Sequence, residues 1–234
     1  MHRLNLLFTL SSLSVLLVTI ERFSFTGKIL LQPYNFLRLH EIIQMTVIIL
    51  LTVAIPTFLL KEVTQNFKNF KQKDFLLLLT FIIGVYFYST GNGVHELASF
   101  LFNHYCNIRD FGGNLCNGFF FNDYYTGNIF YFIGGFMMVA SLLLFERGRP
   151  NETYKKKDLT VTIVNAIIYA FAIFAYAAFD RVLVGLVYSI ITTAFALYLF
   201  SQIRTKYLQF PVITYTTLTY LIGTVAALIV KLVR

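Results

Sequence analysis

The chain has 234 residues, the length of one ordinary domain or of a small two-domain protein. Hydrophobic residues make up 57% of it and charged residues 13%, against about 45–50% and about 25% in a typical soluble protein. A soluble fold of this length cannot bury so much apolar surface, and so few charges cannot cover its outside. The composition therefore excludes soluble, disordered, collagen-like and disulfide-scaffold proteins and predicts a polytopic membrane protein.

The formal net charge of +8 comes from Lys and Arg residues in short stretches between long apolar runs. Basic residues at the ends of transmembrane helices lie in such places, and no basic helix or aromatic–basic module accompanies them here. We therefore expect membrane lipids as partners and no nucleic acid.

Seven apolar stretches meet or approach the length of about 20 residues that a transmembrane helix needs. None alternates strictly between apolar and polar residues, as the strands of a transmembrane barrel do. The sequence thus predicts an all-α, polytopic integral membrane helix bundle of about seven transmembrane helices, forming a single domain over 1–234. In chain order, the stretches are Leu4–Ile20, Ile42–Leu60, Phe75 to about Thr90, Gly127–Phe145, Leu159–Phe179, Val182–Phe200 and Phe210–Val230.

The first stretch allows two interpretations. His2 and Arg3 followed by Leu4–Ile20 have the pattern of a cleaved signal peptide. However, the run ends in Thr19-Ile20-Glu21-Arg22, without a small-x-small cleavage motif. A retained first helix is the favoured interpretation.

Lys and Arg are divided unequally between the two sides of the predicted bundle. The side with the N-terminus and the connections 61–74, 146–158 and 201–209 carries 12 of the 19. The positive-inside rule then predicts that the N-terminus lies inside and the C-terminus outside. The membrane we expect is a plasma (inner) membrane. The acids on the inner side alternate with Lys and Arg, so we expect them to be solvated loop charges; they are Glu62, Asp74, Glu146, Glu152 and Asp158.

The two Cys residues of the chain, Cys106 and Cys116, both lie in a polar segment, 91–125, on the predicted outer side. Two Cys residues close together on an oxidising side predict a local disulfide, with two unpaired thiols as the alternative. A metal-binding pair is disfavoured because the spacing matches no C-x-x-C motif.

The segment 91–125 also holds the most informative polar pattern of the chain. Gly91-Asn92-Gly93 predicts a kink or a break at the end of the third span. At about 100° per residue, the polar residues from Asn92 onward fall on one helix face. Such a face is typical either of a wetted amphipathic helix or of the wall of a polar cavity. These residues are Asn92, His95, Glu96, Ser99 and Asn103.

More His and acidic residues lie at the predicted outer ends of neighbouring spans. Imidazole and carboxylate groups together are typical ligands of zinc and similar divalent metals, which generate a hydroxide nucleophile at neutral pH beside a free Glu that acts as base. We accordingly predict a divalent metal such as zinc, with His40, His95 and Asp123 as ligands and Glu96 as the catalytic base. The predicted polar wall of this pocket consists of Asn92, Ser99, Asn103 and Glu41.

The fourth span carries a stripe of small residues. Gly127, Gly134 and Ser141 recur every seven residues, which is about two helical turns, so they share one face. In membranes such a stripe lets another helix approach closely.

The layout of seven spans with His and Asp gathered at one end resembles that of the seven-helix metal-dependent amidases that include alkaline ceramidases and adiponectin-type receptors. The paired-His motif H-x-x-x-H that those proteins place on a late helix is missing, because spans five to seven contain no His. No residue role is therefore carried over from that family.

Two functions stay open at this point. The first is a membrane-embedded enzyme of the metal-dependent hydrolase type, acting on a lipid or amphiphile through a His/carboxylate site at the outer end. The second is a non-catalytic transporter or membrane assembly partner, in which the polar stripe lines a path or an interface. Spans five to seven offer mainly Thr, Ser, Asn165 and Tyr, and this lack of charge favours the enzyme.

Overall fold

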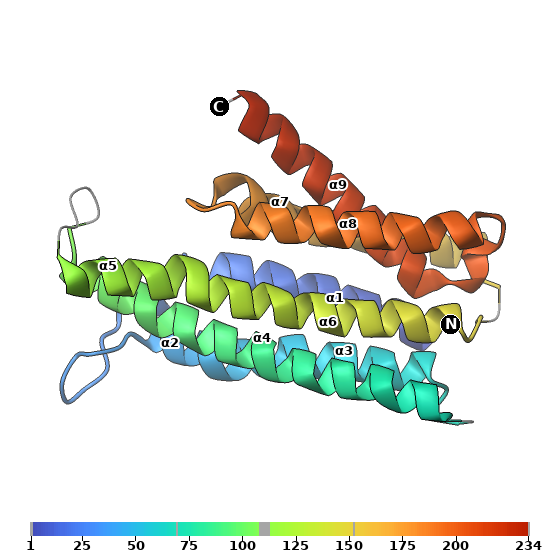
Figure 1. Cartoon of the computed structure of the whole chain (residues 1–234), viewed down its shortest axis with the longest axis horizontal. Coiled ribbons are helices and arrows are strands. Elements are labelled where there is room, and N and C mark those ends of the chain that lie inside the picture. The colour runs from blue at the N-terminus through green and yellow to red at the C-terminus, as the bar shows by residue number, and fades with distance from the viewer. Residues whose placement is uncertain (1, 69, 108–112, 152, 234) are drawn as a thin grey trace.

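The computed structural model describes residues 2–68, 70–107, 113–151 and 153–233, and within them the chain folds into a bundle of long helices without a strand (Figure 1). In chain order the elements are α1 (His2–Glu21), the 3-10 turn η1 (Phe25–Lys28), α2 (Leu39–Ile43), the π-helical turn η2 (Gln44–Ile48), α3 (Ile49–Val63), α4 (Gln72–Tyr105), α5 (Asn114–Phe121), the π-helical turn η3 (Asn122–Gly127), α6 (Asn128–Arg147), α7 (Lys156–Phe179), α8 (Val184–Ile203), the 3-10 turn η4 (Arg204–Gln209) and α9 (Pro211–Val233).

Seven helical segments of the described chain are long and apolar enough to cross a membrane, which confirms the all-α prediction and the seven predicted spans. Their orientation in the membrane stays a prediction from the positive-inside rule. The segments are Arg3–Lys28, Leu39–Val63, Gln72–Tyr105, Asn114–Arg147, Lys156–Phe179, Val184–Gln209 and Pro211–Val233.

The bundle has two ends, which we name by the helix termini that lie there. α1, α4 and α7 end, and α2, α5 and α8 begin, at the left end in Figure 1, which we call the polar end. The N-terminus lies at the opposite end, which we call the N-terminal end. α4 packs against α6, α7 packs against α1 and α9, and α8 packs against α6 and α9.

The third span is longer than predicted. α4 runs as one helix from Gln72 to Tyr105, so the break that was one of the two alternatives predicted at Gly91-Asn92-Gly93 is wrong. Gly91 serves packing instead, because a Cβ atom at this position would lie 2.1 Å from the backbone nitrogen of Tyr131 on α6. Residues 91–105 thus belong to the third spanning helix and not to a separate outer segment.

The predicted small-residue stripe on the fourth span is confirmed as a packing surface. A Cβ atom on Gly134 would lie 2.2 Å from the backbone nitrogen of Tyr88, and one on Gly127 would lie 2.7 Å from that of His95. Ser141, the third member, is fully buried. The backbones of α4 and α6 therefore touch, and this contact fixes His95 against the start of α6.

Two acids that we expected to be solvated loop charges are buried, so that expectation is wrong for both. The carboxylate of Glu146 accepts hydrogen bonds from the backbone N–H groups of Val212 (2.9 Å) and Ile213 (2.7 Å) in the first turn of α9. Asp74 pairs with Arg149 at 2.6 Å. A carboxylate at a helix N-terminus satisfies N–H groups that the helix itself leaves free, which is why burial is tolerated for Glu146.

The predicted disulfide is confirmed. Cys106 at the end of α4 and Cys116 in α5 have their sulfur atoms at a bonding distance of 1.97 Å. The bond ties the end of the third spanning segment to the start of the fourth at the polar end.

Candidate functional site

At the polar end, three helices bring buried acids and a histidine together. Glu21 ends α1, His40 and Glu41 lie in the first turn of α2, and Glu96 lies in the C-terminal half of α4. The three acids are 9% exposed or less. Nδ1 of His40 lies 2.5 Å from Oε2 of Glu21, and Nε2 lies 3.7 Å from Oε2 of Glu96. The imidazole is thus held between two carboxylates from different helices.

Glu21 is a site residue that the sequence analysis missed. Its carboxylate also accepts hydrogen bonds from the hydroxyl of Thr26 (2.5 Å) and the side-chain amide of Gln44 (2.9 Å). The one signal in the sequence was an acid directly after the first apolar run, where the flanking Arg22 suggested an ordinary end-of-span charge.

Glu41 is held by the residue that precedes α2. Its carboxylate accepts the backbone N–H of Arg38 at 3.0 Å and the guanidinium Nε at 2.8 Å, and it also pairs with the guanidinium Nη2. This arrangement is a helix cap, which satisfies a free N–H at the start of α2. Glu41 was predicted as a wall of the pocket, and the structure places it beside His40 with 1% exposure.

His40, Glu41 and Glu96 form a group in which one ligand atom from each lies within 4.8 Å of the others. In the part of the chain that the structure describes, this is the one such group of three or more His, Cys, Asp or Glu residues. The ligand set predicted from the sequence was His40, His95 and Asp123, so the fold shares only His40 with it. Glu96, predicted as the base, lies among the potential ligands.

His95 and Asp123 form a pair of their own between α4 and the π-helical turn η3. Nδ1 of His95 lies 3.1 Å from the backbone carbonyl oxygen of Asp123 and 2.8 Å from its Oδ1. Asp123 is almost fully buried, whereas the side chain of His95 is 36% exposed. Asp123 therefore orients the imidazole of His95, while the His95 side chain stays accessible. His95 directly precedes Glu96 in the chain.

Both π-helical turns of the described chain carry a side chain of this site in their first two residues. η2 begins at Gln44, which donates to Glu21, and Asp123 is the second residue of η3. A π-helical turn inserts one residue into a helix and redirects the side chains around it, and such turns are frequent at functional sites. The sequence pattern carries no signal for them.

The predicted polar stripe of α4 is divided by the structure. Asn92 is buried, and its side-chain amide donates to the backbone carbonyl of Gln44 at 3.4 Å. Asn103 is exposed and donates to the backbone carbonyl of Ser99 at 2.8 Å and to its hydroxyl at 3.2 Å. Asn92 thus joins the site, while Ser99 and Asn103 bond to each other further along α4.

The turn between α7 and α8 extends the polar network across the bundle. The backbone carbonyl of Asp180 accepts a hydrogen bond from Nζ of Lys231 (3.2 Å), and its carboxylate accepts a long one from the side-chain amide of Asn128 (3.5 Å). Burial raises the pKa of the Asp180 carboxyl group, and the backbone N–H of Arg181 and the nearby His95 oppose that rise. Asp180 therefore lies close enough to His95 and Asp123 to interact with both electrostatically.

The fold and the site together define the class of protein: seven apolar helices indicate an integral multi-pass membrane protein, with a His/carboxylate group at one end. The chain matches no protein-family model. Searches of the curated proteins and of the solved structures found no match either. Its function is therefore inferred from the chemistry of its own residues.

Proposed function

We propose that the chain is a membrane-embedded, metal-dependent hydrolase that acts on a lipid or another amphiphile at the polar end of the bundle. The observation that carries this proposal is the group of His40, Glu41 and Glu96, with ligand atoms within 4.8 Å of one another, beside the His95–Asp123 pair.

The surroundings of His40 fit those of a metal ligand. A metal-bound imidazole normally gives its other ring N–H to a carboxylate or carbonyl, which fixes the ring, and Nδ1 of His40 lies 2.5 Å from Glu21. The remaining nitrogen, Nε2, faces Glu96 at 3.7 Å. The sum of one zinc–nitrogen and one zinc–oxygen bond, about 4.0–4.3 Å, is the largest separation that two ligand atoms of one ion can have. The distance of 3.7 Å lies below this limit, so both atoms can bind the same ion.

One imidazole and two carboxylates suit zinc, manganese or ferrous iron. Such an ion lowers the pKa of a bound water to about 7 and polarises a carbonyl or phosphoryl oxygen. With Glu96 as a ligand, the proton-transfer role passes in this proposal from Glu96 to His95, whose ring Asp123 orients. His95 is accessible enough to exchange its proton with the surroundings.

The position of the site favours an amphiphilic substrate. The side chains of His40 and Glu96 are each partly accessible, at 12% and 11%; His40 lies at the start of its membrane-spanning segment and Glu96 in the C-terminal half of its own. The neighbouring connection between α1 and α2 exposes four aromatic side chains, Phe23, Phe25, Tyr34 and Phe36. A molecule whose tail lies in the membrane would present its hydrolysable group at this level.

A separate observation favours the second function, a transporter with a polar path. Between the helices, the hydroxyl groups of Tyr88 and Tyr131 lie 2.8 Å apart, and those of Tyr188 and Tyr220 lie 2.5 Å apart. These pairs join α4 to α6 and α8 to α9. Phenol groups gathered in a membrane interior are hydrogen-bonded partners for a polar solute or for water.

The test of the enzyme is metal content followed by hydrolysis. Purified chain loaded with zinc or manganese and washed should hold about one ion, as measured by mass spectrometry of the metal. His40→Ala and Glu96→Gln should lose it. His104→Ala is the matched control, because His104 is exposed and stacks on Phe100 at 5.1 Å, so this variant should keep the ion.

His95→Gln separates the two parts of the proposal. It should keep the ion but lose the hydrolysis of lipid esters or amides, assayed as a panel of fluorogenic substrates. An ion held equally by all variants would refute the metal site. Hydrolysis that survives His95→Gln would refute the proton-transfer role, and uptake of solute into vesicles that depends on Tyr188 would support the transporter.

A further inference from the structure

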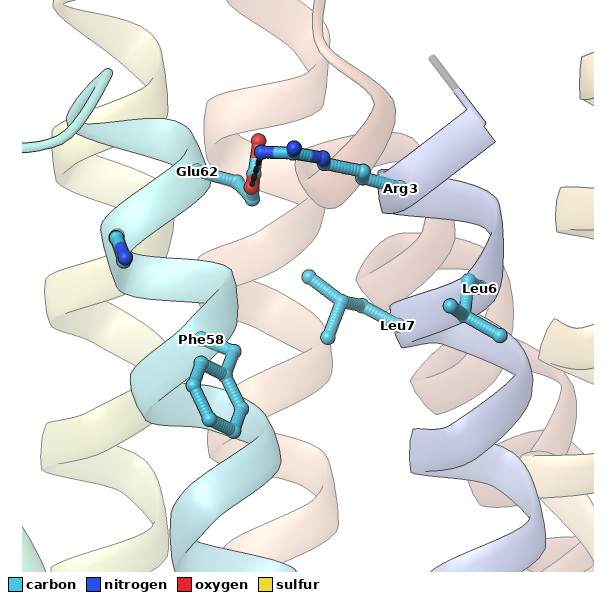
Figure 2. Close-up of a pocket in the computed structure, with 6 residues that line it drawn as sticks. Arg3, Leu6, Leu7, Phe58 and Glu62 are labelled. Atoms are coloured by element: carbon cyan, nitrogen blue, oxygen red, sulfur yellow. Dashed lines mark ion pairs between the residues drawn. The ribbon is translucent and has the colours of Figure 1, made fainter.

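A groove lies between α1 and α3 at the N-terminal end of the bundle, opposite the candidate site. It has a volume of about 220 Å³. Figure 2 shows Arg3 reaching from α1 across to Glu62 on α3, with the apolar side chains of Leu6, Leu7 and Phe58 nearby. The lining also includes Lys61.

The walls of the groove face the surrounding lipid. Leu6 is 50% exposed and Phe58 is 55% exposed, and both belong to membrane-spanning segments. Leu7 closes the groove toward the core with 9% exposure. In a bilayer the neighbour of such an apolar surface is an acyl chain. Part of an extended hydrocarbon chain therefore suits this groove.

The rim of the groove carries an excess of positive charge. Nη1 of Arg3 lies 3.5 Å from Oε1 of Glu62, and the Arg3 side chain is 80% exposed, so most of its five donors stay open. Lys61 is exposed in the last turn of α3. Arg3 and Lys61 together with Glu62 thus give the rim a net charge of one positive unit, at the start of α1 and the end of α3.

We propose that this groove binds one phospholipid with an anionic headgroup. Its acyl chain lies along Leu6, Leu7 and Phe58, and its phosphate is held by Arg3 and Lys61. Arg presents a fork of donors that matches phosphate geometry, and Lys adds a point charge. The same end of the bundle carries most of the Lys and Arg residues of the chain, which raises the local concentration of anionic lipid. This site is independent of the proposed hydrolase.

The test is native mass spectrometry of the full chain equilibrated with equal amounts of phosphatidylglycerol and phosphatidylcholine. The wild type should retain one phosphatidylglycerol in preference to phosphatidylcholine. Arg3→Gln combined with Lys61→Gln should weaken its retention roughly 10- to 30-fold, at about fivefold for each basic side chain near an anionic surface. Lys61→Gln alone, which leaves the Arg3–Glu62 pair in place, should weaken it about fivefold.

The matched control changes the same charge at the same end of the bundle. Arg204 and Lys206 are exposed in η4 and do not line the groove, so Arg204→Gln combined with Lys206→Gln should leave retention unchanged. Equal loss in both double variants would overturn the site. Equal retention of phosphatidylcholine and phosphatidylglycerol by the wild type would overturn the anionic headgroup.

Discussion

Nδ1 of His40 at the start of α2 lies 2.5 Å from Oε2 of Glu21 at the end of α1. The two residues are 19 positions apart in the chain, and the connection between α1 and α2 brings them together. Glu21 is itself held by Thr26 and Gln44. The imidazole therefore has a fixed orientation, with Nε2 turned toward Glu96.

Glu21→Gln should weaken metal binding without touching a ligand. Carboxylates that orient a metal-bound histidine contribute about 10- to 100-fold to metal affinity, so we expect a loss of that size in competition with a chelator. Glu62→Gln, at the opposite end of the bundle, is the control and should bind metal as the wild type does. Unchanged affinity in Glu21→Gln would show that Glu21 does not orient a metal ligand.

Gly91→Ala and Gly93→Ala should act in opposite directions although they lie two residues apart. A Cβ atom on Gly91 would strike the backbone of α6, so we expect destabilisation by about 1–3 kcal/mol or more. Nothing lies within 4 Å of a Cβ atom on Gly93, and Ala is favoured over Gly in a helix by roughly 1 kcal/mol. The fraction of protein that stays soluble after heating in detergent measures the stability of both variants. Equal effects of the two substitutions would contradict the close contact of α4 and α6.

Glu146→Ala should be among the most destabilising changes at the N-terminal end. It removes the acceptor of two N–H groups in the first turn of α9 and leaves them buried, at a cost of about 3 kcal/mol or more. Glu146→Gln keeps one acceptor oxygen and should restore part of the loss. Resistance to heat in detergent reports the order wild type, Gln, Ala. Equal stability of Ala and Gln would refute the capping role.

Asp180 should make the protein less stable as the pH rises. Burial raises the pKa of its carboxyl group above the ordinary value of 3.8, so the folded chain binds this proton more tightly than the unfolded chain does. Stability from this group is complete below about pH 4 and is lost as the pH rises through the folded-state pKa. Asp180→Asn should therefore flatten the decline in heat resistance above pH 4, and an unchanged slope would assign the decline to other groups.

The connection between α1 and α2 should rest in the lipid interface. Phe36 is 65% exposed there, and aromatic residues at this level of a membrane protein favour the headgroup region. Because the chain contains no Trp, Phe36→Trp introduces a single fluorophore. Its emission should be blue-shifted in vesicles and quenched by brominated lipid, and strong quenching by aqueous iodide instead would place the connection in water.

The sequence by itself determined the number of spans, the Cys106–Cys116 pair and the packing stripe on the fourth span. Each of these features depends only on residues that are close together in the chain. An apolar run of sufficient length has no alternative in a membrane but to form a helix. Cys106 and Cys116 are close in the chain, and Gly127, Gly134 and Ser141 share a face through helical periodicity alone.

Packing between helices decided the rest. The break predicted at Gly91 disappears because contact with α6, and not glycine flexibility, governs that position. The burial of Glu146 depends on N–H groups that belong to the last helix of the chain. The set of His40, Glu41 and Glu96, with Glu21 beside His40, depends on how α1, α2 and α4 lie relative to one another. Distances between side chains on separate helices are set by contacts between the helices, and the periodicity of a single helix does not predict those contacts.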